Sequence, residues 1–107
     1  MAELHIKRLT CEKRQSSFGK DQTSIQIGGF TISGPHTLGK DDDVSLNVRR
    51  TFTGAVSVDL FEEDGGSAGD HLGTITVPQG LAGRGDQTAD FAAAPNARYK
   101  MLFDVHA

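Results

Sequence analysis

The sequence predicts an all-β protein, an antiparallel Greek-key β-sandwich of seven to eight strands. Short segments alternate apolar and polar residues with a period of two, as half-buried strands do. The chain is rich in threonine, valine and isoleucine, and thirteen glycines in 107 residues supply turns between these segments. No window has the apolar period of a helix, so we expect two packed antiparallel sheets.

Each expected strand ends at a turn signal. In chain order the expected strands are residues 4–11, 23–27, 30–33, 43–52, 55–62, 72–77, 86–92 and 97–105. Gly28 and Gly29 join the second strand to the third, because two residues that accept positive φ between alternating arms favour a hairpin. We expect loops at 12–22, 34–42 and 78–85, the last because a proline and three glycines interrupt a ladder.

The whole chain, residues 1–107, is expected to form a single domain, because its length allows one hydrophobic core. Eight of the residues expected to fill a two-layer core are Ile6, Ile25, Ile27, Ile32, Val56, Val58, Leu60 and Phe103. In the last strand one face is expected to hold Tyr99, Met101, Phe103 and Val105.

Charge and cysteine content narrow the function classes. The formal net charge of −3 argues against a general nucleic-acid binder. Cys11 is the only cysteine, so no intrachain disulfide forms, and we expect it to be an inert packing residue. The first residues lack a long apolar run, which predicts a cytoplasmic protein, or one exported without a classical signal peptide.

The acidic segment LFEEDGGSAGDHLGTITV is the most informative part of the chain. Acids concentrate at Glu62, Glu63 and Asp64, and Asp70 follows after the small residues 65–69, which we expect to form a loop. Carboxylates held close together repel one another unless a cation lies between them. Oxygen ligands without a cysteine or histidine cluster favour calcium over transition metals.

This segment resembles the third calcium-binding loop of C2 domains. Those loops show an acid, any residue, an acid, a short glycine-containing loop, a third acid, and a pair such as Leu-Gly that opens a strand. Glu62, Asp64, Asp70 and Leu72-Gly73 match that order. The resemblance covers roughly residues 4–105 and is greater to bacterial stand-alone C2-like chains than to eukaryotic lipid binders.

Upstream, FGKDQTSIQI resembles the first calcium loop of C2 domains, where Gly19, Lys20 and Asp21 fit the pattern. The residues Gln15-Ser16-Ser17 depart from it, because the family has a further aspartate there. Phe18 is the one large apolar candidate at a loop tip.

The resemblance implies a calcium site formed by Asp21, Glu62, Asp64 and Asp70, with backbone and water oxygens completing six to eight ligands. Incompletely acidic loops predict weak binding, with a Kd of order 10⁻⁴ to 10⁻³ M. A second acidic cluster, Asp41-Asp42-Asp43, is expected to be an Asx-type turn, and an additional ion site there stays open.

We expect a non-enzymatic binding or adaptor module with a protein partner. The sequence has no Gly-x-Ser-x-Gly elbow, phosphate loop or His-Glu-x-x-His motif. One alternative is a structural subunit that self-associates into a homo-oligomer, fibre or shell through edge strands, with 43–52 and 97–105 as candidate edges. Another is calcium-dependent docking to anionic membranes. The four histidines are expected to be surface residues, because none has a partner at metal spacing: His5, His36, His71 and His106.

Overall fold

The protein is an eight-stranded antiparallel sandwich, as predicted. The computed structural model describes residues 1–13, 21–64, 67–91 and 97–107, and for residues 13, 21, 63–64 and 67–70 it describes the backbone alone. The strands are β1 (Ala2–Lys13), β2 (Asp21–Ile27), β3 (Phe30–Leu38), β4 (Asp43–Phe52), β5 (Ala55–Asp64), β6 (Ser67–Pro78), β7 (Gln87–Phe91) and β8 (Arg98–His106). A 3₁₀ turn, η1 (Gln79–Leu81), follows β6.

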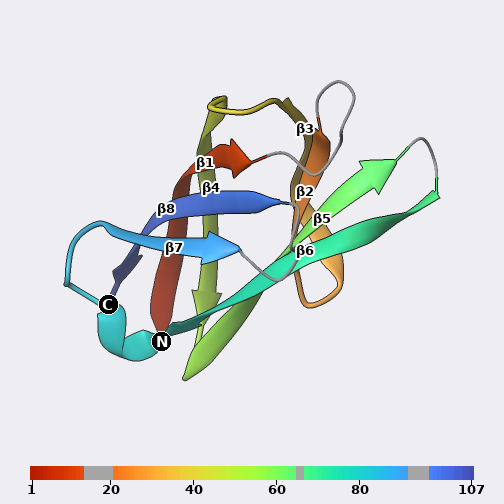
Figure 1. The fold of residues 1–107 in the computed structure, drawn as a ribbon. Coiled ribbons are helices and arrows are strands. Elements are labelled where there is room, and N and C mark those ends of the chain that lie inside the picture. The colour runs from red at the N-terminus through yellow and green to blue at the C-terminus, as the bar shows by residue number, and fades with distance from the viewer. Residues whose placement is uncertain (14–20, 65–66, 92–96) are drawn as a thin grey trace.

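Two four-stranded sheets form the two layers, with strand orders β4-β1-β8-β7 and β3-β2-β5-β6 (Figure 1). Every pairing is antiparallel. The N- and C-termini lie close together at one end of the sandwich in Figure 1. At the other end β1 and β5 finish and β2 and β6 begin, and we name this the acidic end. The first sheet has β4 and β7 as edges, so the expectation that residues 97–105 form an edge is wrong, because β8 lies between β1 and β7.

Apolar side chains from both sheets meet between the layers. Of the eight predicted core residues, Ile6, Ile25, Val58, Leu60 and Phe103 are buried, while Ile27, Ile32 and Val56 are half-buried and pack against the core. The predicted face of the last strand is confirmed, since its four residues are all buried. Cys11 is also fully buried, as a packing residue would be.

Strand β3 continues through a position where the sequence predicts a loop. Gly34 has a φ of 108°, which favours glycine, and a Cβ at this position would lie 2.6 Å from the Thr23 carbonyl oxygen on β2. The missing side chain therefore lets the two backbones approach, and pairing resumes through His36, Thr37 and Leu38 after a register shift. The expected loop at 34–42 is correspondingly reduced to the residues between Leu38 and Asp43.

The acidic segment is a long hairpin rather than the loop that its glycines suggest. Strand β5 reaches Asp64 and β6 starts at Ser67, with Asp64 paired to Ser67 and Glu62 to Asp70. The two strands place different numbers of residues between their paired positions, and register shifts accommodate this difference. One of these shifts lies between Glu62 and Asp64. Backbone pairing to a neighbouring strand has outweighed the weak strand preference of the small residues.

Candidate functional site

The strand register brings the four predicted calcium ligands to the acidic end of one sheet. On the central strand β5, Glu62 is paired with Thr23 of β2 on one side and with Asp70 of β6 on the other. Asp21 lies two residues before Thr23, and Asp64 lies two residues after Glu62. Asp21 of β2 is thus brought, along the sheet end, to the acidic residues of the consecutive strands β5 and β6.

Buried polar side chains are found next to this end. Among the residues whose side chains the structure describes, the buried polar or charged ones are Thr23, Ser24 and Glu62, and Glu62 is 7% exposed. Burying a carboxylate is costly unless a cation or hydrogen-bond donors compensate it. The strand pairing shows that the backbones of these residues lie at the same end of the sheet. That the carboxylates of Asp21, Asp64 and Asp70 converge stays a prediction, because the structure describes only the backbone of these residues. The first-loop residues 15–20 lie outside the described part of the chain.

The second acidic cluster forms a turn, as the sequence predicts. The Asp42 carboxylate accepts a hydrogen bond from the Gly39 amide at 2.8 Å, and the Asp42 amide donates to the Gly39 carbonyl at 3.0 Å. Asp41 has a φ of 66°, and its amide donates to the Cys11 carbonyl on β1. The turn between β3 and β4 lies at the acidic end, but it is not an Asx turn, because the Asp42 carboxylate bonds the amide three residues before it and not the one two residues after it.

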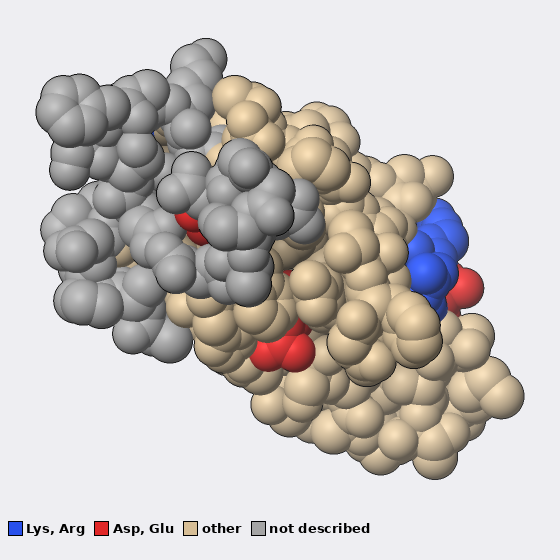
Figure 2. Space-filling model, turned by 90° about the vertical axis from the view of Figure 1, so that its right-hand side faces the viewer, with Lys and Arg blue, Asp and Glu red and all other residues tan. Residues whose placement is uncertain are grey.

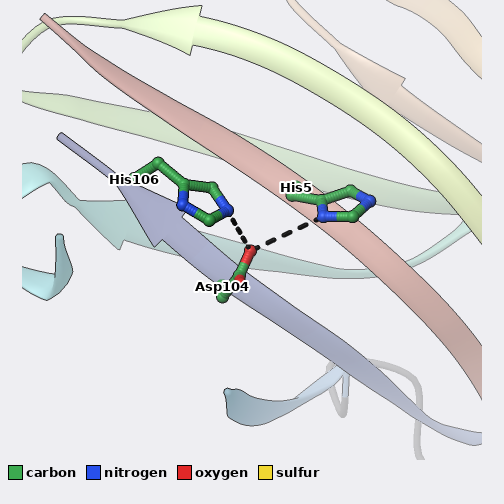
Figure 3. A group of neighbouring side chains, drawn as sticks. All are labelled: His5, Asp104 and His106. Carbon is green, nitrogen blue, oxygen red and sulfur yellow. Dashed lines mark ion pairs between the residues drawn. The ribbon is translucent and has the colours of Figure 1, made fainter. Parts of the chain in front are cut away.

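A second constellation lies near the opposite end, on the outer face of the β4-β1-β8-β7 sheet. His5, Asp104 and His106 place one ligating atom each within 4.8 Å of one another (Figure 3). The Asp104 Oδ1 atom lies 3.1 Å from His106 Nε2 and 3.7 Å from His5 Nδ1. Sequence reasoning missed this cluster because His5 lies at the opposite end of the sequence from Asp104 and His106. The available signal was that the first and last strands each carry outward histidines.

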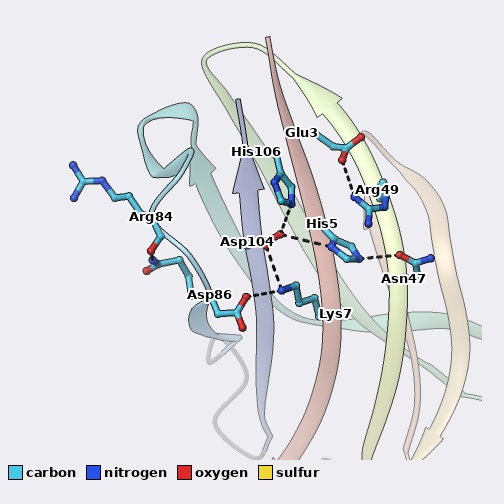
Figure 4. Close-up of polar contacts among 10 residues, drawn as sticks. Glu3, His5, Lys7, Asn47, Arg49, Arg84, Asp86, Asp104 and His106 are labelled. Atoms are coloured by element: carbon cyan, nitrogen blue, oxygen red, sulfur yellow. Dashed lines mark hydrogen bonds and ion pairs between the residues drawn. The ribbon is translucent and has the colours of Figure 1, made fainter.

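Further polar contacts surround this cluster (Figure 4). The His5 Nε2 atom is 2.8 Å from Asn47 Oδ1 on β4. The Lys7 ammonium lies 2.6 Å from Asp86 and 3.3 Å from Asp104 Oδ2. The hydrogen bond to Asp86, and then that to Asp104, raises the pKa of Lys7 above its ordinary value of 10.5.

Strand alternation places Lys7 on the same face as His5, and a β-bulge brings Arg8 out of the core as well. The register of β1 against both neighbours shifts between Ile6 and Arg8, so Lys7 and Arg8 lie between two buried residues, Ile6 and Leu9. One extra residue in the strand allows two consecutive side chains to leave the core. The bulge explains the irregular alternation of the first strand.

Figure 2 shows one face of the molecule, a quarter turn from the view of Figure 1. On the part of this face that the structure describes, Lys and Arg side chains gather at one margin and acidic side chains lie apart from one another. The basic side chains of Lys7 and Arg49 form ion pairs, Lys7 with Asp86 at 2.6 Å and Arg49 with Glu3 at 2.9 Å. Within the described segments no helix is long and apolar enough to cross a membrane.

Comparison with known proteins identifies the fold. No family model and no curated protein matches the sequence. Among solved structures, a chain described as "Structure of a C2 domain" matches over 100% of both chains with a TM-score of 0.66 and 9% identity. The C2A and C2B domains of Extended-Synaptotagmin 2 match with a TM-score of 0.52 and 11% identity, over 97% of this chain and 40% of that one. The chain is a β-sandwich, and that sandwich has the C2-like fold predicted from residues 62–73.

Proposed function

We propose that the chain is a non-enzymatic binding module whose acidic end binds calcium weakly through Asp21, Glu62, Asp64 and Asp70. In this proposal the ion orders the acidic end, and the ordered end presents a surface to a protein partner. The C2-like fold supports the kind of module, and the acidic end supports the ion.

The pairing of Glu62 with Asp70 carries the calcium proposal. Like charges at directly paired positions of neighbouring antiparallel strands are destabilising. Asp21 and Asp64 add two more carboxyl groups within two residues of Thr23 and Glu62, which are themselves paired. A cation at this end offsets the repulsion among all four, which is the reason to expect one.

The donor chemistry fits calcium. All four residues offer carboxylate oxygens, and calcium takes six to eight oxygen ligands with tolerant geometry. The hard, purely oxygen donor set disfavours metals that prefer imidazole or thiolate. The four residues supply the protein ligands, and backbone carbonyls and water supply the remainder.

Calcium titration with thermal melts tests the proposal. If the Kd is about 10⁻³ M, then calcium at about ten times that concentration stabilises the fold by about 1.4 kcal/mol. For a domain of this size that free energy raises Tm by roughly 5–8 °C. We expect the double variant Asp64→Asn with Asp70→Asn to lose both the heat of binding and the rise in Tm.

The matched control is Asp90→Asn, the same change at an exposed aspartate of the edge strand β7. It is expected to keep the full calcium response. A response that survives in the double variant, or that is absent from the wild-type chain, contradicts the calcium site. In the second case the module proposal rests on the fold alone.

The described surface gives less support to membrane docking. Lys7 and Arg49 are each paired with an acid, and the described part of the face in Figure 2 has basic side chains at its margin alone. Sedimentation with vesicles containing anionic lipid, with and without calcium, is expected to leave the protein in the supernatant. Calcium-dependent pelleting would replace the protein-partner proposal with a lipid one.

A further inference from the structure

We propose that His5, Asp104 and His106 form a binding site for a divalent transition-metal ion of the zinc class. The site lies on the outer face of the β4-β1-β8-β7 sheet, near the end of the sandwich opposite the acidic end (Figure 3). It is independent of the calcium proposal, because it shares no residue with it and uses nitrogen donors.

The two inner strands of the sheet hold the three residues in place. His5 on β1 is paired directly with Asp104 on β8, and His106 is two positions further along β8, where its partner is Glu3. Residues two apart in a strand share a face, so His106 and Asp104 are both available to His5. Ligands carried by paired inner strands have little backbone freedom, which favours a defined site.

Two of the three separations between ligand atoms are close to those of a tetrahedral centre, and the third, between the two histidines, is within 4.8 Å. Metal bonds of about 2.0–2.1 Å at the tetrahedral angle place neighbouring ligand atoms about 3.3 Å apart. The separation of His106 Nε2 and Asp104 Oδ1 is 3.1 Å, and that of His5 Nδ1 and Asp104 Oδ1 is 3.7 Å. The side chain of His106 is 52% exposed, so a small rotation can bring it to the ion. The outward face leaves the fourth position to water.

Asn47 holds His5 in the orientation that a metal ligand needs. Its Oδ1 atom accepts a hydrogen bond from His5 Nε2–H, which leaves the lone pair on Nδ1 directed at the Asp104 side. A metal-bound histidine commonly donates its other ring N–H to such a partner. With neither a proton nor a metal ion on Nδ1, this lone pair faces the lone pairs of Asp104 Oδ1.

The Asp104 oxygen at the centre of the cluster lacks a hydrogen bond. Oδ1 is shielded from water, and within the described residues it has no hydrogen-bond partner. Lys7 contacts the other oxygen, Oδ2, at 3.3 Å and is itself paired with Asp86. The carboxylates of Asp86 and Asp104 carry two negative charges against the one positive charge of Lys7, so the local charge still favours a cation. Oδ1 of Asp104 is the oxygen available to bind it.

The donor set selects the class of metal. Two imidazoles and one carboxylate suit zinc, copper, nickel and iron, whereas calcium prefers an oxygen cage. We use Zn²⁺ as the probe because it has no redox chemistry and accepts three protein ligands plus water.

Isothermal titration of untagged, full-length protein with ZnCl₂ in a chelator-free buffer tests the site. We expect one Zn²⁺ per chain, and an affinity at least tenfold lower in His106→Gln and in His5→Gln. His71→Gln, the same change at an exposed histidine of the other sheet, is the control and is expected to bind as the wild type does. The calcium-site variant Asp64→Asn with Asp70→Asn is also expected to bind Zn²⁺ normally.

Two further readouts separate metal ligation from a structural role. Asn47→Asp keeps the acceptor for His5 and adds charge, so it is expected to tighten Zn²⁺ binding severalfold, since a carboxylate partner makes the imidazole a better ligand. In long-range ¹H–¹⁵N spectra of the histidine rings, Zn²⁺ is expected to shift Nδ1 of His5 and Nε2 of His106. Circular dichroism confirms that each variant is folded.

Three outcomes would overturn the proposal. They are an absence of Zn²⁺ binding by the folded wild-type chain, binding that survives unchanged in both His5→Gln and His106→Gln, and binding that depends equally on His71. In the first case the cluster is a set of histidine–aspartate ion pairs only.

Discussion

Among individual residues, Gly34 decides whether β2 and β3 can pair along their whole length. Its φ of 108° disfavours any residue with a side chain, and a Cβ there would lie only 2.6 Å from the Thr23 carbonyl oxygen. Gly80, in η1, differs on both counts, because its φ lies outside the left-handed region and a Cβ there meets nothing within 4 Å.

We therefore expect Gly34→Ala to lower the free energy of unfolding by about 2–4 kcal/mol, the sum of backbone strain and overpacking. Gly80→Ala is expected to change it by no more than about 0.5 kcal/mol. Urea unfolding of the two variants measures the contrast. Equal stability of both would show that β3 does not lie against Thr23 at this point.

Lys7 is the residue whose charge state links stability to alkaline pH. Because Asp86 and Asp104 raise its pKa in the folded state, its stabilising contribution is fully present below the ordinary value of 10.5. That contribution is lost as the pH rises through the higher folded-state pKa. We expect Lys7→Met to be less stable than the wild type at neutral pH, with the difference narrowing above pH 10.5.

Urea midpoints measured from neutral pH to beyond the ordinary lysine value check this dependence. The control is Lys40→Met, at an exposed lysine of the β3–β4 turn. The difference between its urea midpoint and that of the wild type is not expected to narrow as the pH rises. A gap between Lys7→Met and wild type that widens with rising pH would contradict the expected sign.

Among the strands, those with a clear apolar period were predictable and interrupted ones were not. The 43–52 strand matches β4, and the Gly28-Gly29 hairpin is present, with φ values of 63° and 83° at its two glycines. The prediction failed at 34–38 and 67–70, where glycine and proline indicate a break. There the neighbouring strands supply the hydrogen bonds that local preference does not, and no single-chain pattern reports them.

The inner strands should be the most stable elements. β1 and β8 are hydrogen-bonded on both sides, whereas β7 is a short edge strand. In native-state hydrogen exchange we expect the paired amides of β1 and β8 to exchange through global unfolding alone, and those of β7 to exchange earlier. Earlier exchange from β8 than from β7 would contradict the strand order.

Across the complete sandwich, the sheet edges carry features that oppose self-association. Pro35 lies on the edge strand β3, and Arg49 and Arg50 are exposed on the edge strand β4. Proline and charge on an edge both hinder pairing with another chain. These features favour a separate module over the structural subunit of a fibre or shell.

We therefore expect a single chain of 11.4 kDa by light scattering, even at high protein concentration. The edge variant Arg49→Thr with Arg50→Thr is expected to increase the apparent mass, because it removes the charges that protect β4. A wild-type mass that rises with concentration would restore the assembly hypothesis.

The two candidate sites differ in how far the sequence reveals them. The acidic residues of β5 and β6 form a contiguous motif, so Glu62, Asp64 and Asp70 could be proposed as ligands from the sequence alone. The site at His5, Asp104 and His106 depends on the pairing of the first strand with the last, which spacing along the chain does not encode. Outward-facing histidines on two strands were visible, but their proximity follows only from the strand register.

The pairing of β1 with β8 also constrains how the protein acquires its structure during synthesis. β1 leaves the ribosome before the other seven strands of the sandwich, yet one of its two hydrogen-bonding sides stays open until Arg98–His106 have been made. Tyr99, Met101 and Phe103, which close the core, arrive at the same late moment. The nascent domain therefore exposes an apolar strand until its last strand has left the ribosome, and only then can the β4-β1-β8-β7 sheet close.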